Sequence, residues 1–219
     1  SGAVMAFNNL IVGTGTGPDP NGTVSEYAGI RVASVWGGSI QISNNTIYNN
    51  GARLSNTSGA LYVTGSTVLT NNIVKAINGE VYVASNSNSS QITGARNVFA
   101  GAGTAPVANF ATAASTNLSV DPMFVNEAQN NLQLQASSPA IDSGATVSYD
   151  NDDMLGIKRP QGKGYDRGAY EFCGNSSAGT LAFSPSTLSF GNVTNGKSST
   201  LTGTIQNMGS STISISSIT

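Results

Sequence analysis

The stretch SGALYVTGSTVLTNNIVKAINGEVYVAS, residues 58 to 85, contains nearly the same short strand twice. Residues 59 to 64 read GALYVT and residues 79 to 84 read GEVYVA, with Asn71 and Asn72 between the two copies. Aliphatic residues alternate with other residues in each copy, which is the period of a β-strand. A strand that returns after a short interval indicates a repeat architecture.

A third copy of the strand lies nearer the N-terminus. The aligned segments are residues 29 to 34, 60 to 65 and 80 to 85. We expect their aliphatic side chains to share one face, while Arg31, Tyr62 and Tyr82 share the opposite face. The predicted aliphatic columns of the stacked core are Ile30, Leu61 and Val81, followed by Val32, Val63 and Val83.

Asparagines form a second repeated column, each just before an aliphatic segment. The repeated asparagines are Asn9, Asn45, Asn72 and Asn97, at spacings of 36, 27 and 25 residues (45 − 9, 72 − 45, 97 − 72). Asparagine tolerates the left-handed conformation of a sharp turn, and its amide both donates and accepts hydrogen bonds. We therefore predict turns held by a ladder of stacked amides. A catalytic or ligand-binding role for these asparagines is the alternative.

Two columns that recur in the same order predict a solenoid. Each strand would pair in parallel with its equivalent one winding away, at a spacing of about 4.8 Å. Neighbouring windings would bury the apolar side chains that one winding cannot bury alone. An antiparallel sandwich is the alternative fold, but the chain has few two-residue hairpin signals at regular spacing.

Composition narrows the class of protein. The chain has 219 residues, of which 9% are charged, with a net charge of −2, no histidine and one cysteine, Cys173. This charge provides no basic patch for nucleic acid, and no apolar run approaches the ~18 residues of a membrane helix. A single cysteine cannot form an internal disulfide. We expect an extracellular or cell-surface protein without a membrane span.

Four motifs follow the coils: VDPMFVN (120 to 126), SPAIDSG (138 to 144), KRPQG (158 to 162) and DRGAYEF (166 to 172). With the asparagine pattern, this series resembles right-handed parallel β-helix proteins, the pectate-lyase-like superfamily in its broad sense. The closing segment is similar to the choice-of-anchor Q type of many secreted bacterial proteins. The resemblance implies β-helix coils over residues 1 to 120 and a closing segment over residues 121 to 175.

The closing segment contains most of the acidic residues. We expect residues 138 to 141 to lie over the open apolar end of the solenoid, because a solenoid must cap its last coil. The predicted ion-pair and hydrogen-bond staples of this cap are Arg159, Asp166 and Glu171. The weak candidates for a calcium site are Asp150, Asp152 and Asp153. Their spacing fails the EF-hand pattern, and a solvated acidic turn is the alternative.

Residues 179 to 219 show a different pattern, with LAFSP, LSFGN and TLTGTI segments. They resemble the first half of an ASPM/SPD-2/Hydin-like immunoglobulin module. The expected fold is therefore all-β, a right-handed parallel β-helix followed by a partial immunoglobulin-like sandwich. An incomplete sandwich leaves exposed edges, so we expect the chain to continue or strands to come from a neighbouring subunit.

The residue types in the coils do not favour a catalytic role. Hydrolysis of a glycoside normally needs two carboxylates, yet Glu80 is the only acid between residues 28 and 120. A lyase could use Lys75 or Arg96 as its base. Three tyrosine or tryptophan residues, Trp36, Tyr62 and Tyr82, are candidates for sugar stacking, with ordinary packing as the alternative.

We predict a non-catalytic structural or adhesive scaffold without a cofactor. Its partners would be other copies, which could join through open ends into a filament or tube, or other surface proteins. The alternatives are a carbohydrate-binding module and the C-terminal fragment of a polysaccharide lyase or hydrolase whose active site lies on other coils. Glycan binding without product release would favour the module, and new reducing ends or unsaturated products would favour the enzyme.

Overall fold

The computed structural model describes most of the chain. The described residues are 3–13, 28–32, 39–50, 59–63, 65–85, 92–104, 111–112, 116–174, 181–185, 187–207, 213–215 and 217. Within them the elements are β-strands and one short 3-10 turn, η3 (Glu127–Gln129). Trp36 lies outside the described residues.

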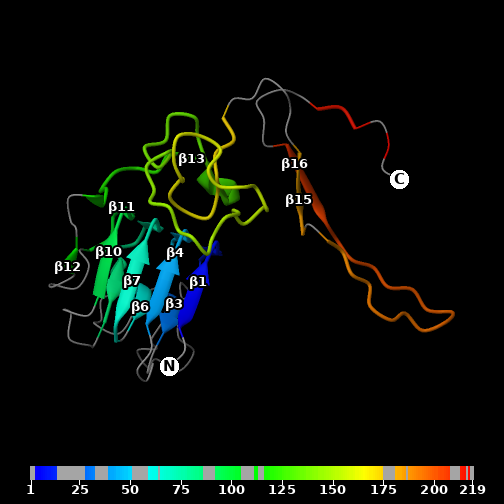
Figure 1. Ribbon diagram of the computed structural model, residues 1–219, viewed down its shortest axis with the longest axis horizontal. Helices are drawn as coiled ribbons and strands as arrows, with labels where there is room; N and C mark the ends of the chain where they lie inside the picture. The colour runs from blue at the N-terminus through cyan, green and yellow to red at the C-terminus, as the bar shows by residue number, and fades with distance from the viewer. Residues whose placement is uncertain are drawn as a thin grey trace.

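Three parallel sheets form the N-terminal part (Figure 1). The first sheet contains β1 (Val4–Phe7), β4 (Ile40–Ser43), β7 (Thr67–Thr70), β10 (Ile92–Ala95) and β12 (Ala111–Thr112), in that order. The second sheet contains β2 (Leu10–Val12), β5 (Thr46–Tyr48), β8 (Ile73–Ala76) and β11 (Val98–Gly101). The third sheet contains β3 (Ala28–Val32), β6 (Gly59–Val63) and β9 (Val83–Ala84).

The chain visits these sheets in rotation, so β1, β2 and β3 make one winding and β4, β5 and β6 make the next. Each strand pairs in parallel with its equivalent in the neighbouring winding. These pairings confirm the prediction of an all-β chain whose strands stack in parallel, as in a β-solenoid.

Alternate residues of each strand point into the windings, and these inward residues form an apolar interior. Fully buried members of this inner core are Ile40, Ile42, Ile47, Leu61, Val63, Leu69, Val74 and Val83. Ile30 and Val32 are partly buried and pack against the same cluster. One winding thus buries its side chains on those of the next, which is the source of stability in a solenoid.

The register of the third sheet differs from the prediction by two residues. Ile30 pairs with Leu61 and Val32 with Val63 as expected. Leu61, however, pairs with Val83, and the half-buried Val81 lies outside the core cluster. The predicted pairings of Leu61 with Val81 and of Val63 with Val83 are therefore wrong. A shift of two residues keeps Val83 on the inward face, so the alternating pattern alone could not predict this register.

Residues 121 to 174, here called the cover, wrap the outer face of the second sheet. They contain the antiparallel pair β13 (Phe124–Asn126) and β14 (Asn131–Leu134). A second apolar core lies between the cover and outward side chains of the sheet, and its buried members are Ile73, Val98, Ala100, Phe124, Leu132, Leu134, Ala140, Ala169 and Tyr170. The expectation that residues 138 to 141 lie over the open end of the solenoid is wrong, because Ala140 and Ile141 pack in this second apolar core at its side.

The C-terminal part contains one antiparallel pair within the described residues, β15 (Leu181–Ser184) with β16 (Thr204–Asn207). Figure 1 shows the chain that joins the two strands extending away from the solenoid. Several large apolar side chains here are exposed, namely Phe183, Leu188, Phe190, Val193, Leu201, Ile205 and Ile215.

Candidate functional site

The repeated asparagines lie above one another in the turns that join the first and second sheets. The side-chain Nδ2 of each asparagine donates to the Oδ1 of the asparagine in the next winding. The distances are 2.8 Å from Asn9 to Asn45, 2.9 Å from Asn45 to Asn72 and 2.9 Å from Asn72 to Asn97. Asn117 is a fifth asparagine of the ladder, and its Oδ1 accepts from the Nδ2 of Asn97 at 3.2 Å. Asn117 is not among the predicted ladder residues, although Asn117-Leu118 repeats the asparagine–aliphatic pattern in a shorter form.

Each inner amide also bonds to the neighbouring sheet. The Nδ2 of Asn72 donates to the carbonyl of Ile42 (2.8 Å), and the Nδ2 of Asn97 donates to that of Leu69 (3.0 Å). Asn45, Asn72 and Asn97 are fully buried. Their donors and acceptors are thus occupied inside the turn, which describes a structural ladder.

The sharp turn itself is made by the residue before each ladder asparagine. Asn8, Asn44, Asn71 and Arg96 have φ values of 54°, 51°, 57° and 56°. Asparagine adopts this left-handed conformation more easily than most residues. The ladder and turn duties predicted for one asparagine are therefore divided between two neighbours.

The turn asparagines also hold the cover. Asn8 and Asn44 both donate to the carboxylate of Asp150. The side chain of Asn71 donates to the carbonyl of Ala145 (2.7 Å) and accepts from its N–H (2.8 Å). Burial raises the pKa of Asp150 above its ordinary value. The cover therefore attaches to the solenoid through a row of amides from successive windings.

The three predicted cap staples, Arg159, Asp166 and Glu171, lie together inside the cover. The Nη1 of Arg159 donates to Oε2 of Glu171 at 2.8 Å, and both side chains are completely buried. Arg159 also donates to the carbonyls of Asp166 (3.3 Å) and Gly168 (2.9 Å). Its Nη2 reaches Oδ1 of Asn8 at 3.2 Å, so the cluster also contacts the first turn.

The carboxylate of Asp166 receives backbone donors from Asp142 (2.8 Å) and Phe172. Burial and then the neighbouring charge of Glu171 raise the pKa of Asp166 to about 7. Burial also raises the pKa of Glu171, although Arg159 and two backbone N–H groups oppose that effect. The cluster therefore combines strong hydrogen bonding with costly burial of charge.

The candidate calcium ligands have separate partners. Asp153 accepts from the N–H groups of Leu155 and Ile157, both at 2.8 Å, and burial raises its pKa. Asp152 pairs with Lys158 at 2.7 Å on the surface. Among the described residues no group of three histidine, cysteine, aspartate or glutamate side chains has the arrangement of a metal site.

Lys75 and Arg96, the candidate lyase bases, do not share a site. Lys75 contacts Glu127 and lies 3.1 Å from Asp121, whereas Arg96 donates to the carbonyl of Ser143 at 3.0 Å. Burial alone would lower the pKa of Lys75, but hydrogen bonds and ion pairs with Glu127 and Asp121 raise it overall. A base must lose its proton, so this environment opposes that role.

Neither predicted stacking tyrosine offers an open ring. Tyr82 is 8% exposed and packs in the inner core, with its ring centroid 5.5 Å from that of Phe99. Tyr62 is 2% exposed, and the guanidinium of Arg31 lies 4.9 Å from its ring centroid. The prediction of sugar stacking is thus wrong for these two residues, and Tyr82 packs with the inner core instead of sharing the outward face with Tyr62.

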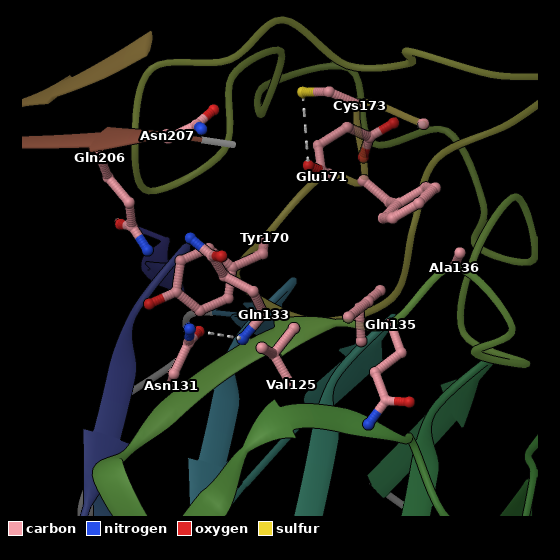
Figure 2. A pocket seen from close by; sticks show the side chains of 13 residues that line it. Val125, Asn131, Gln133, Gln135, Ala136, Tyr170, Glu171, Cys173, Gln206 and Asn207 are labelled. Atoms are coloured by element: carbon pink, nitrogen blue, oxygen red, sulfur yellow. Dashed lines mark hydrogen bonds between the residues drawn. The ribbon is translucent and has the colours of Figure 1, made fainter. Parts of the chain in front are cut away.

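A cavity of about 370 Å³ lies where the cover meets β16 (Figure 2). We call it the junction cavity. Its lining comes from β13, from β14 and the two residues that follow it, from residues 170 to 174 and from β16. The sequence does not predict this cavity, because it depends on how the cover meets the pair of β15 and β16, which no motif specifies.

Comparison with known proteins gives no relative: no protein-family model, curated protein or solved structure matches this chain. In the described part of the chain, no helix has the length and hydropathy needed to cross a membrane.

Proposed function

We propose that this chain is a non-catalytic β-solenoid scaffold of a secreted or cell-surface protein. One observation carries the proposal: buried charged side chains and backbone groups of the cover bind the amide side chains in the turns of the solenoid. Arg159 and Asp150 reach Asn8, and Ala145 exchanges two hydrogen bonds with Asn71. Polar groups used in this way make a rigid body with a continuous apolar interior, which suits a spacer or a platform.

The same contacts favour a scaffold over an enzyme fragment with its active site on these windings. Catalytic acids and bases must be reachable by substrate and must change protonation during the reaction. Glu171 and Asp153 instead accept hydrogen bonds inside the cover, and Lys75 forms ion pairs with Asp121 and Glu127. These groups support the fold.

We propose further that the solenoid is of the right-handed, pectate-lyase-like type and that β15 and β16 belong to an immunoglobulin-like module. The antiparallel pairing of Leu181 with Asn207 and Ser184 with Thr204 supports the module. So does the exposure of Phe183 and Ile205, which such a sandwich would bury.

The scaffold proposal is tested by incubating the purified chain with polygalacturonate and with a neutral polysaccharide. We expect neither new reducing ends nor the ultraviolet absorbance of unsaturated uronates. Product formation would overturn the proposal if it were lost in a Lys75→Met variant and kept in an Asn78→Ala variant. Binding of a glycan without cleavage would favour carbohydrate binding as an additional role, and the chain would still be non-catalytic.

A further inference from the structure

The walls of the junction cavity are rich in carboxamides. Asn131 and Gln133 come from β14, and Gln206 and Asn207 come from β16. Figure 2 shows the side chains of Gln133 and Gln206 approaching the ring of Tyr170 from two different elements. Carboxamides donate and accept hydrogen bonds at the same time, which suits a ligand whose groups do the same.

The cavity carries little charge. Of the residues that line it, none is basic, and Glu171 is the only acid. Its carboxylate already accepts from Arg159, Gln161 N–H and Asp166 N–H. Burial raises the pKa of Tyr170 to about 12 and that of Cys173 to about 11, so both are neutral at physiological pH.

Apolar groups complete the site. Val125, Leu134 and Ala136 lie among the lining residues, together with the ring of Tyr170. An aromatic ring with a polar tip provides a flat apolar surface beside a hydrogen-bonding group. The volume of about 370 Å³ falls within the range of about 300–1,000 Å³ typical of small-molecule sites.

We propose that the junction cavity binds a neutral carbohydrate of one or two rings. Sugar hydroxyls both donate and accept, as the carboxamides do, and the C–H faces of a sugar ring match the apolar wall. An acidic sugar would lack a basic partner among the lining residues, so the cavity selects against uronates. This binding site goes beyond the scaffold role and does not depend on it.

The direct test measures binding of cellobiose and maltose at millimolar concentration by saturation-transfer NMR, with digalacturonate as the charged comparison. We expect saturation transfer to a neutral disaccharide and none to digalacturonate. Removing one neutral hydrogen bond in Gln206→Ala or Tyr170→Phe should weaken binding by roughly three- to tenfold. Gln41→Ala, a substitution outside the cavity, should leave binding unchanged.

The single cysteine gives a second readout without mutation. Cys173 lines the cavity and is half-buried, so a bound sugar should slow its alkylation by iodoacetamide. The proposal is overturned if neither disaccharide gives saturation transfer or if digalacturonate binds as well as they do. It is also overturned if Gln206→Ala and Tyr170→Phe bind like the unaltered chain, or if the bound sugar does not protect Cys173.

Discussion

Replacing Asn72 with alanine should strongly destabilise the solenoid. Asn72 is fully buried in the middle of the asparagine ladder. Its Oδ1 accepts from the backbone N–H (3.2 Å) and the Nδ2 (2.9 Å) of Asn45. Its Nδ2 donates to the Ile42 carbonyl (2.8 Å) and to Oδ1 of Asn97 (2.9 Å). Alanine removes all four bonds.

The cost follows from what each partner keeps. The Nδ2 of Asn45 retains the carbonyls of Ala6 and Ser43, but its buried backbone N–H loses the acceptor that Asn72 supplies. A buried donor without an acceptor costs about 1–3 kcal/mol, and each further lost bond adds about 1 kcal/mol. With one orphaned donor and three further lost bonds, we therefore expect the free energy of unfolding to fall by about 4–6 kcal/mol.

Urea unfolding followed by circular dichroism measures this loss as a shift in midpoint at constant slope. Asn78→Ala is the matched control, because Asn78 is an exposed asparagine whose side chain donates to Asn49 at 3.1 Å. The control should change stability by no more than about 0.5 kcal/mol. If Asn72→Ala unfolds at the same urea concentration as Asn78→Ala, the ladder does not stabilise the turns as we argue.

Three further predictions concern the cover and the register. Glu171→Ala leaves the buried guanidinium of Arg159 without its counter-ion and should lower the free energy of unfolding in urea by about 3–5 kcal/mol. Lys158→Ala breaks an exposed ion pair and should lower it by at most about 1 kcal/mol. Equal losses in the two variants would contradict the buried cluster. Because the pKa of Asp166 rises from 3.8 to about 7 on folding, the folded state favours its protonated form, so stability should fall as pH rises from about 4 to about 7. The dependence of stability on pH should become weaker in Asp166→Asn. An unchanged dependence would show that Asp166 is not its cause. Gly59→Ala should lower the melting temperature, because its Cβ would lie 2.7 Å from the carbonyl of Val81; an unaffected melting temperature would contradict the observed register.

The stacked parallel strands could be predicted from the sequence because two local signals agree. Strands such as Gly59–Val63 alternate with period two, and asparagines precede the next strand at Asn45, Asn72 and Asn97. The aliphatic side chains need a neighbouring winding to bury them, and the turns need residues that adopt the left-handed conformation. Few folds other than a solenoid satisfy both requirements.

The features of the fold and the site that could not be predicted depend on long-range contacts, which local sequence patterns do not specify. The two-residue shift at Val81 and Val83 preserves alternation, so a motif alignment cannot detect it. Leu132 and Leu134 predict a half-buried strand but not which surface it covers, and that surface proved to be the side of the solenoid. The partners of Asp150 are turn residues more than one hundred positions away, Asn8 and Asn44.

The central claim is that equivalent strands of successive windings lie side by side in parallel, and disulfide trapping tests it directly. Gln41 pairs with Val68, and Val68 pairs with Thr93, on the outer face of the first sheet. In a Cys173→Ser background, cysteines at 41 and 68 should oxidise to an intramolecular disulfide, because strands about 4.8 Å apart fall within the Cα range of about 4.4–6.8 Å. Cysteines at 41 and 93, about 9.6 Å apart across two windings, should stay reduced. Disulfide formation by the second pair and not the first would contradict the account.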